Sequence, residues 1–182
     1  AYPLITWTDG GKALSREVDA KTEPRTIKII RAEDSGIISF LRERMKDGGC
    51  AGIIVNTVAR AQQMLNLIKA EFADYATILD HAQFAMPDRI RREERIVERL
   101  GKESTPEKRD RLIVIGTQVL EQSLDIDFDT LITDLCPMDL LLQRIGRLQR
   151  HTWRTRPASA GQPVCMVLGT DLNALEPGAE FI

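Results

Sequence analysis

The segment LIVI, at residues 112–115, consists entirely of apolar residues, and three of the four are β-branched. A short apolar run of this kind is typical of a strand that is buried on both faces of a parallel sheet. Comparable runs lie on both sides of it along the chain, and segments with helical spacing of apolar residues separate them. This alternation predicts βαβ units, and therefore an α/β fold with three layers, in which helices flank an open and mainly parallel sheet.

The predicted elements follow one another through most of the chain. Strands are predicted at residues 26–30, 53–55, 76–79, 112–115, 131–133 and 164–168, and helices at residues 37–45, 58–72, 87–100 and 138–148. Residues 102–110 are predicted to be a polar link. We expect one domain at residues 26–170, a linker or edge strand at residues 1–25, and the start of a following segment at residues 171–182.

Composition excludes several classes of protein. The 182 residues carry a formal net charge of −2, so any nucleic-acid site must be a local basic patch. The three cysteines are far apart, which argues against a disulfide framework, and two histidines are too few for a histidine-rich metal centre. With neither an apolar run of ~20 residues nor a signal peptide, we expect a cytoplasmic protein without a metal site or a membrane partner. The chain begins at Ala1 rather than Met, which favours a fragment of a larger protein.

Residues 143–151, QRIGRLQRH, combine three arginines with no acidic residue. On a helix, Gln143, Arg147 and Arg150 share one face, since they recur at i, i+4 and i+7. The opposite face carries three apolar side chains, those of Leu141, Ile145 and Leu148. The residues alone fit two interpretations: a phosphate site, because guanidinium groups match phosphate oxygens, or a solvated basic face. Gly146 in mid-helix costs about 1 kcal/mol, which indicates a close approach of another group there.

The segment before it, IGTQVLEQSLDIDF at residues 115–128, favours the phosphate site. Thr117 and Gln118 follow a predicted strand at its carboxyl end, where open α/β sheets bind ligands. Asp125 and Asp127 could form a metal pair; the alternative is that one caps a turn and the other is solvated, and we favour this alternative for Asp127. The stretch DGGK at residues 9–12 lacks the first glycine and the hydroxyl of a phosphate loop and is predicted to be a plain turn.

Two longer stretches, TQVLEQSLDIDFD (residues 117–129) and DLLLQRIGRLQRH (residues 139–151), resemble motifs V and VI of superfamily-two helicases. The residues in these stretches most resemble those of the CRISPR-associated helicase-nuclease of type I systems. IIVNTVARAQQML (residues 53–65) resembles motif IV of that family, and HAQFAMPDRIRREE (residues 81–94) resembles its histidine-led segment. The motifs occur in the expected order between residues 52 and 151. Ser123 departs from the broader helicase pattern, in which many members have Gly.

The resemblance implies a fold and an activity. The chain is expected to be the second RecA-like lobe, of the P-loop NTPase type, of an ATP-dependent helicase or translocase acting on single-stranded DNA. It contains neither a Walker A lysine nor a DExD/H box, so ATP with Mg²⁺ is expected to be held mainly by a first lobe outside this chain, and the chain alone is expected to be inactive. The implied partners are single-stranded DNA, the first RecA-like lobe and nuclease domain of the same parent chain, and an RNA-guided surveillance complex.

The resemblance also implies roles for individual residues. Arg147 and Arg150 are expected to be arginine fingers on the γ-phosphate. The expected ATP-site residues are Gln143, Asp125 and Gly146, and the expected nucleic-acid contacts are Thr57, Thr117, Gln118 and Arg89. Two alternatives remain open: a non-enzymatic α/β module that binds nucleic acid or a partner, and the lobe of a different superfamily-two helicase that acts on RNA.

Overall fold

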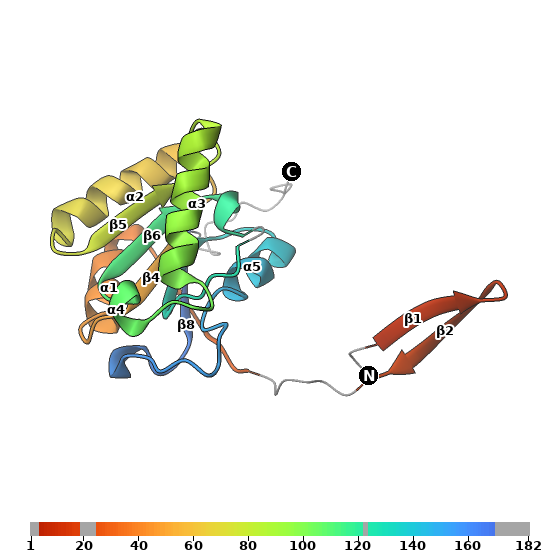
Figure 1. The fold of residues 1–182 in the computed structure, drawn as a ribbon. Helices are drawn as coiled ribbons and strands as arrows, with labels where there is room; N and C mark the ends of the chain where they lie inside the picture. Colours follow the sequence, from red (N-terminus) through yellow and green to blue (C-terminus); the bar gives the residue numbers. More distant parts are fainter. Residues whose placement is uncertain (1–3, 19–24, 122–123, 170–182) are drawn as a thin grey trace, which may run out of the picture.

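A six-stranded parallel sheet forms the centre of the molecule, in the strand order β3-β8-β7-β4-β6-β5 (Figure 1). The computed structural model describes residues 4–18, 25–121 and 124–169. The strands are β3 (Lys28–Ala32), β4 (Cys50–Ile54), β5 (Ala76–Asp80), β6 (Leu112–Gly116), β7 (Thr130–Asp134) and β8 (Val164–Leu168). Each strand pairs with its neighbours in parallel, as the alternating pattern predicts. The carboxyl ends of β4 and β6 therefore lie side by side at one edge of the sheet.

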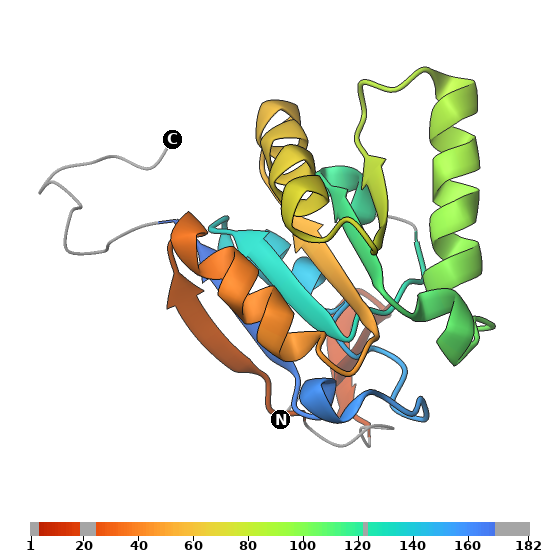
Figure 2. The ribbon, with the colours of Figure 1, turned by 90° about the vertical axis from the view of Figure 1, so that its left-hand side faces the viewer.

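Helices cover both faces of the sheet (Figure 2). The helices α1 (Ile37–Arg44) and α2 (Val58–Glu71) pack on one face, and α3 (Met86–Leu100) and α5 (Met138–Ile145) contribute to the core on the other. Strand β6 shows why its sequence is apolar throughout: Ile113 and Ile115 face the α1 and α2 side, and Leu112 and Val114 face the α3 side. All four side chains are fully buried, which confirms the predicted strand and the three-layer α/β fold.

Local sequence explains where several elements begin. The Thr57 side chain accepts a hydrogen bond from the Arg60 backbone N–H at 3.2 Å and so caps the N-terminus of α2. Pro87 occupies the first turn of α3, where its missing N–H costs nothing. Gly52 lies in β4 beneath the Phe128 ring, and a Cβ at this position would lie 2.7 Å from ring carbons. The strand therefore needs a glycine there.

Residues 4–17 form a β-hairpin rather than the predicted linker or edge strand. Strands β1 (Leu4–Asp9) and β2 (Lys12–Glu17) form a separate two-stranded antiparallel sheet, which does not pair with the central sheet. Gly10 and Gly11 both adopt positive φ, as a tight two-residue hairpin turn requires, so the predicted turn is confirmed. The hairpin residues are exposed, including the cross-strand pair of Trp7 and Leu14.

Two further segments differ from the sequence-based expectation. The predicted polar link at residues 102–110 contains a one-turn helix, α4 (Pro106–Arg109), whose Arg109 is buried. The predicted helix at residues 138–148 ends three residues earlier, at Ile145, and Gly146 is its C-cap. Within the described ranges, no helix is long and apolar enough to cross a membrane.

Candidate functional site

Residues 143–151, called the arginine segment below, begin in α5 but leave the helix before Arg147. The backbone N–H of Phe128 donates to the Arg147 carbonyl, and the N–H of Gln149 donates to the Phe128 carbonyl, both at 2.8 Å. This parallel bridge pulls the chain out of helical geometry, and Gln149 adopts a positive φ of 47°. The prediction that Gln143, Arg147 and Arg150 share a helical face is therefore wrong, because pairing with a distant segment overrides the local helical pattern.

Gly146 is predicted to lie in the middle of a helix, but it lies at the C-terminal end of α5. It is the C-cap of α5 and has the right-handed helical values φ −60° and ψ −12°. A Cβ at Gly146 would lie 3.2 Å from the Gln143 carbonyl and 3.3 Å from the Leu142 carbonyl. The glycine therefore accommodates the tight last turn of the helix.

Arg147 and Arg150 nevertheless lie close to each other and to the segment at residues 117–125. Nη2 of Arg147 donates to the Glu121 carbonyl at 2.7 Å, and Nε of Arg150 donates to Oδ1 of Asp125 at 2.8 Å. Burial lowers the pKa of Arg147, and the positive charge of Arg150 lowers it further. Burial raises the pKa of Asp125, but the hydrogen bond from Arg150 and the neighbouring His151 outweigh it and bring the pKa below its ordinary value.

Arg144 is a central residue to which the sequence analysis assigned no role. Its side chain is 1% exposed, and its Nε donates to Oε1 of Glu121 at 2.7 Å. The signal was present in the sequence: Arg144 follows Leu141 by three residues and precedes Ile145, so it falls on the apolar side of α5. Gln143, the residue before it, is exposed.

The carboxyl ends of β4 and β6 bring together three predicted nucleic-acid residues. Thr57 and Gln118 are exposed at these neighbouring strand ends. Thr117 is only 1% exposed, and its hydroxyl oxygen has no hydrogen-bond partner among the described residues. Ser123 lies outside the described residues.

The histidine-led segment lies at the end of the neighbouring strand β5. His81 stacks on Phe84 with ring centroids 4.0 Å apart, and the Arg92 guanidinium lies 3.9 Å from the Phe84 ring centroid. Asp80 is fully buried, and neither carboxylate oxygen has a hydrogen-bond partner in the described part of the chain. Burial raises the Asp80 pKa to about 6, with a further contribution from Glu93 that nearby arginines oppose. The predicted contact residue Arg89 pairs with Glu93 at 3.1 Å.

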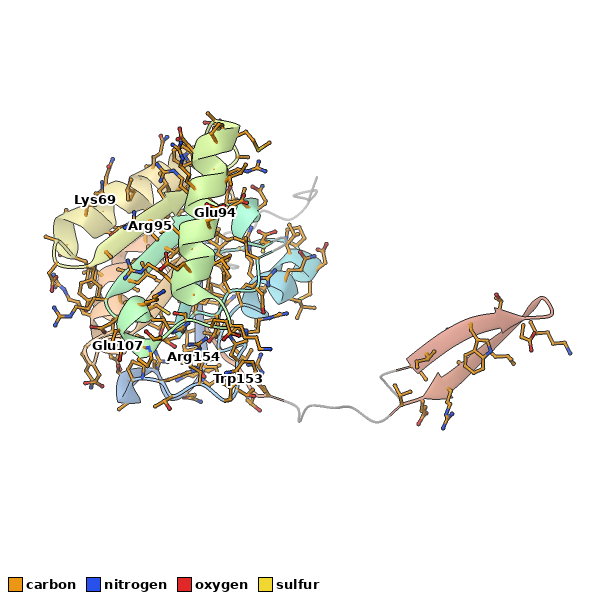
Figure 3. The ribbon with its side chains drawn as sticks, in the orientation of Figure 1. Lys69, Glu94, Arg95, Glu107, Trp153 and Arg154 are labelled. Atoms are coloured by element: carbon orange, nitrogen blue, oxygen red, sulfur yellow. The ribbon has the colours of Figure 1, made fainter. Side chains whose placement is uncertain are left out.

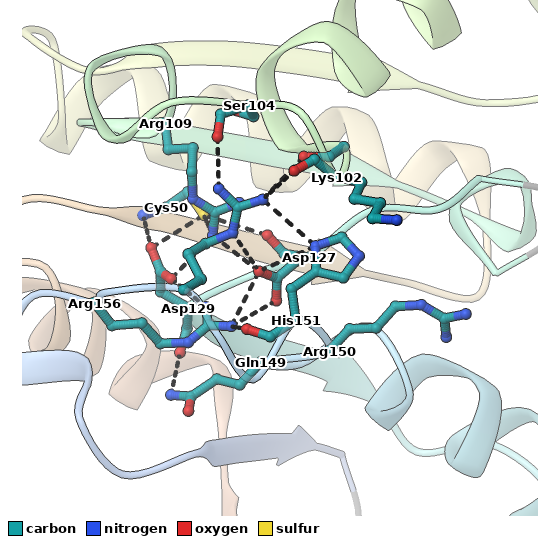
Figure 4. A network of polar contacts seen from close by, with 12 residues as sticks. Cys50, Lys102, Ser104, Arg109, Asp127, Asp129, Gln149, Arg150, His151 and Arg156 are labelled. Carbon is teal, nitrogen blue, oxygen red and sulfur yellow. Dashed lines mark hydrogen bonds and ion pairs between the residues drawn. The ribbon is translucent and has the colours of Figure 1, made fainter. Parts of the chain in front are cut away.

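A network of buried charged side chains lies next to the arginine segment (Figure 4). Asp127 is fully buried, so the interpretation of this residue as a turn cap or a solvated carboxylate misses its role as a buried ion-pair partner. Its carboxylate forms ion pairs with Nε of Arg154 and Nη2 of Arg156, both at 3.0 Å. Asp129 pairs with Arg109 and Arg156 and accepts a hydrogen bond from the Cys50 backbone N–H. These arginines lie on distant segments, so nothing in the local sequence revealed the network.

His151 connects this network to the arginine segment. Its Nε2 lies 3.4 Å from Oδ1 of Asp125, and its Nδ1 lies 3.7 Å from Oδ2 of Asp127. The ring also stacks on Trp153 with centroids 4.8 Å apart. Trp153 is at the surface beside Arg154 (Figure 3). In the described ranges, no group of three or more His, Cys, Asp or Glu residues could hold a metal ion.

Comparison with known proteins identifies the family of this chain. The profile of the family described as "CRISPR-associated nuclease/helicase Cas3, C-terminal" matches residues 47–153, more than half of the chain. The chain belongs to the Cas3 family. This match confirms the family predicted from the four motifs, and it includes the segments that carry Thr57, Thr117, Asp125 and Arg147.

Individual Cas3 proteins match nearly the whole chain. The Cas3 nuclease/helicase of Streptococcus thermophilus is 44% identical over 171 residues, which cover 93% of this chain and 18% of that protein. The Cas3 endonuclease/helicase of Escherichia coli K12 is 37% identical over 183 residues, covering 94% of this chain and 20% of that protein. The chain thus spans about a fifth of the length of these Cas3 relatives.

Solved structures give the same result. A crystal structure titled T. fusca Cas3-ATP superposes with a TM-score of 0.79 at 32% identity, covering 91% of this chain and 21% of that one. A chain of a "CRISPR RNA-guided surveillance complex, pre-nicking" superposes with a TM-score of 0.77 at 33% identity, covering 90% of this chain and 22% of that one. The C-terminal domain of the DEAD-box protein Dbp5 (TM-score 0.52, 17% identity, covering 82% of this chain and 78% of that one) shares the fold. The chain therefore has the fold of a RecA-like C-terminal helicase lobe and corresponds to the C-terminal helicase region of Cas3.

Proposed function

We propose that this chain is the second RecA-like lobe of an ATP-dependent helicase or translocase, which acts on single-stranded DNA in CRISPR interference. The observation that carries the proposal is the pair of neighbouring arginines, Arg147 and Arg150, each fixed by the segment at residues 117–125. Arg147 is bound to a neutral carbonyl and Arg150 to one exposed carboxylate, so the pair keeps a net positive charge. Such a pair suits the terminal phosphate of a nucleoside triphosphate.

In this proposal the lobe supplies charge stabilisation rather than the phosphate-binding loop. Arg147 and Arg150 act as arginine fingers on the γ-phosphate, and Gln143, Gly146 and Asp125 line the same site. ATP with Mg²⁺ is held mainly by a first RecA-like lobe outside the chain. Guanidinium groups that neutralise charge on the transferred phosphate accelerate related hydrolyses by about 10³–10⁵-fold. Because ATP is held mainly by the first lobe, we propose that the isolated second lobe does not hydrolyse it.

The nucleic-acid surface is proposed at the carboxyl ends of β4, β5 and β6. Thr57 and Gln118 are exposed there, and Arg89 extends the surface from α3. Thr117 is buried there, and its hydroxyl has no hydrogen-bond partner among the described residues, so in this proposal it reaches the DNA backbone only if the loop opens. Opening and closing of the two lobes around ATP would then move the protein along the strand.

The partners of the whole protein are also part of the proposal. They are single-stranded DNA, the first lobe and a nuclease domain of the same parent chain, and an RNA-guided surveillance complex. Relatives about five times longer, and a relative solved within a surveillance complex, support this assignment. We also propose a cytoplasmic location, which the sequence predicts.

The test is ATP hydrolysis by the full-length parent polypeptide, with and without single-stranded DNA. Arg147→Ala and Arg150→Ala are each expected to reduce the DNA-stimulated rate at least about 10³-fold while the fold survives. Arg42→Ala is a matched control, since Arg42 forms an exposed pair with Glu71 on α1 and α2. Full activity in both finger variants contradicts the proposal. Stimulation by RNA alone favours a different helicase, and tight, steeply salt-dependent DNA binding without hydrolysis favours a binding module.

A further inference from the structure

Helix α5 buries its arginine and exposes apolar side chains. Arg144 is its one buried residue, whereas Met138 is 67% and Leu142 61% exposed. The Arg144 guanidinium lies within hydrogen-bonding distance of five acceptors, three of which share the two hydrogens of Nη1, and one of the five is a carboxylate. The acceptors are Glu121 Oε1 (2.7 Å), Thr133 Oγ1 (2.8 Å), Asn56 Oδ1 (3.0 Å), the Asp134 carbonyl (3.2 Å) and the Ile54 carbonyl (3.4 Å).

Stability alone does not account for this arrangement. Burying an arginine and a glutamate costs desolvation free energy, and apolar residues of similar volume often stabilise a core at least as well as a buried ion pair. Both partners are 1% exposed, so the cost falls on each of them. An ion pair in this position instead fixes the direction in which its neighbours point.

The neighbours of Arg144 are the loops that carry the proposed nucleic-acid contacts. Asn56 precedes Thr57, the cap of α2, and its backbone N–H is fixed separately by the Asp134 carboxylate at 3.0 Å. Glu121 follows the short 3-10 helix at Gln118–Leu120. Its backbone N–H donates a hydrogen bond to the Gln118 carbonyl. One side chain thus holds both loops, at the carboxyl ends of β4 and β6.

Glu121 also holds the candidate arginine finger. Its carboxylate accepts from Arg144, while its carbonyl accepts from Nη2 of Arg147 at 2.7 Å. Its other carboxylate oxygen, Oε2, is buried without a hydrogen-bond partner among the described residues. A displacement of the 118–121 turn therefore changes the Arg144 and Arg147 contacts together.

We propose that Arg144 and Glu121 form a positioning pair, which couples nucleic-acid contact at the Thr57 and Gln118 loops to the orientation of Arg147. In this proposal, neither side chain contacts ATP or nucleic acid itself. DNA that moves either loop shifts the guanidinium of Arg144, and Glu121 passes the shift to Arg147 through its backbone carbonyl. The inference rests on the proposed function, because it names how that ATP site responds to DNA.

The first test compares ATP hydrolysis rates with and without single-stranded DNA in the full-length parent polypeptide. In Arg144→Lys, a shorter side chain with one nitrogen cannot reach all five acceptors, so the stimulation by DNA is expected to fall about tenfold, a typical size for coupling between sites. The rate without DNA and the KM for ATP are expected to stay within about twofold of wild type. The control is Arg109→Lys, since Arg109 is similarly buried but pairs with Asp129 at the amino ends of the strands.

Glu121→Gln tests the other side of the pair. It keeps the backbone carbonyl and the shape of the side chain but removes the charge, so we expect a smaller loss of stimulation than in Arg144→Lys. The double variant is expected to be no worse than Arg144→Lys alone, because two residues of one pair do not act additively. Retained stimulation in Arg144→Lys, or an equal loss of the rates with and without DNA, overturns the inference.

The second test uses this chain alone and needs no activity. Amide hydrogen exchange in Arg144→Lys is expected to increase together at residues 56–60, at residues 118–121 and at Arg147. In Arg109→Lys the increase is expected near Cys50 and Asp129 instead. Unchanged exchange at residues 56–60 overturns the inference. A wild-type parent polypeptide that DNA does not stimulate contradicts the proposed function, whereas stimulated wild type with equally stimulated Arg144→Lys contradicts the coupling alone.

Discussion

Arg150 donates a hydrogen bond from Nε to Oδ1 of Asp125 at 2.8 Å, and about half of each side chain is exposed. An exposed ion pair contributes at most about 1 kcal/mol to stability, because water and salt screen it and both side chains lose freedom. Asp125 therefore holds Arg150 in a defined direction, and little free energy opposes its release toward a more highly charged phosphate.

The first prediction concerns Asp125. Asp125→Asn is expected to change the free energy of unfolding by less than about 1 kcal/mol, since the pair that it breaks is exposed. Urea denaturation of the chain measures this. A loss of several kcal/mol would show that Asp125 supports the fold rather than the direction of Arg150.

The second prediction is that loss of the Asp127 charge lowers stability far more than loss of the Asp125 charge. Asp127→Asn removes the charge that compensates Arg154 and Arg156, whose side chains are 7% and 8% exposed, and is expected to cost about 3–5 kcal/mol. The same urea measurement applies, and Asp125→Asn, two residues away, is the matched control. Equal effects at the two positions would contradict the buried network.

The pH dependence of stability is predicted from Asp80, whose pKa is raised from 3.8 to about 6. Between these values the folded chain binds more protons at this site than the unfolded chain, so its contribution to stability falls as the pH rises and levels off above about 6. Relative to wild type, Asp80→Asn should gain up to roughly 3 kcal/mol between pH 4 and pH 7. Denaturation curves across this range measure the difference, and a constant difference would show that the Asp80 carboxyl titrates normally.

Gly52 provides a test of core packing. In Gly52→Ala the new methyl group meets the Phe128 ring at 2.7 Å, and the ring is fully buried, so a loss of about 1–3 kcal/mol is expected. Gly36→Ala is the control, since the nearest atom to a Cβ there lies at an ordinary 3.5 Å. Thermal unfolding of both variants compares them. A similar effect at both positions would mean that the Phe128 ring moves aside freely.

The sheet and the helices that cover it were predictable because apolar patterns report burial directly. Residues 112–115 are apolar since both faces of β6 are covered, and that information lies within the segment itself. The predicted element positions agree with the structure to within a few residues, apart from the hairpin and α4.

The site was predictable only in part, because its geometry depends on contacts between distant segments. The resemblance located Arg147, Arg150 and Asp125, and the structure brings all three near one another. The end of α5 depends on the Phe128 bridge, and the burial of Asp127 depends on Arg154 and Arg156. Neither contact leaves a periodic pattern in the sequence.

The stack of Trp153 on His151 gives the lobe an optical reporter. Trp153 and Trp7 are the two tryptophans, so in Trp7→Phe all indole emission comes from Trp153. Its ring lies against His151, which in turn lies 3.4 Å from Asp125, the partner of Arg150. If Arg150 acts as the proposed arginine finger, its departure toward a phosphate is expected to alter the charge around His151 and thus the quenching of the indole. Under that proposal, Trp153 fluorescence would follow this arginine in real time, without a label attached to the protein.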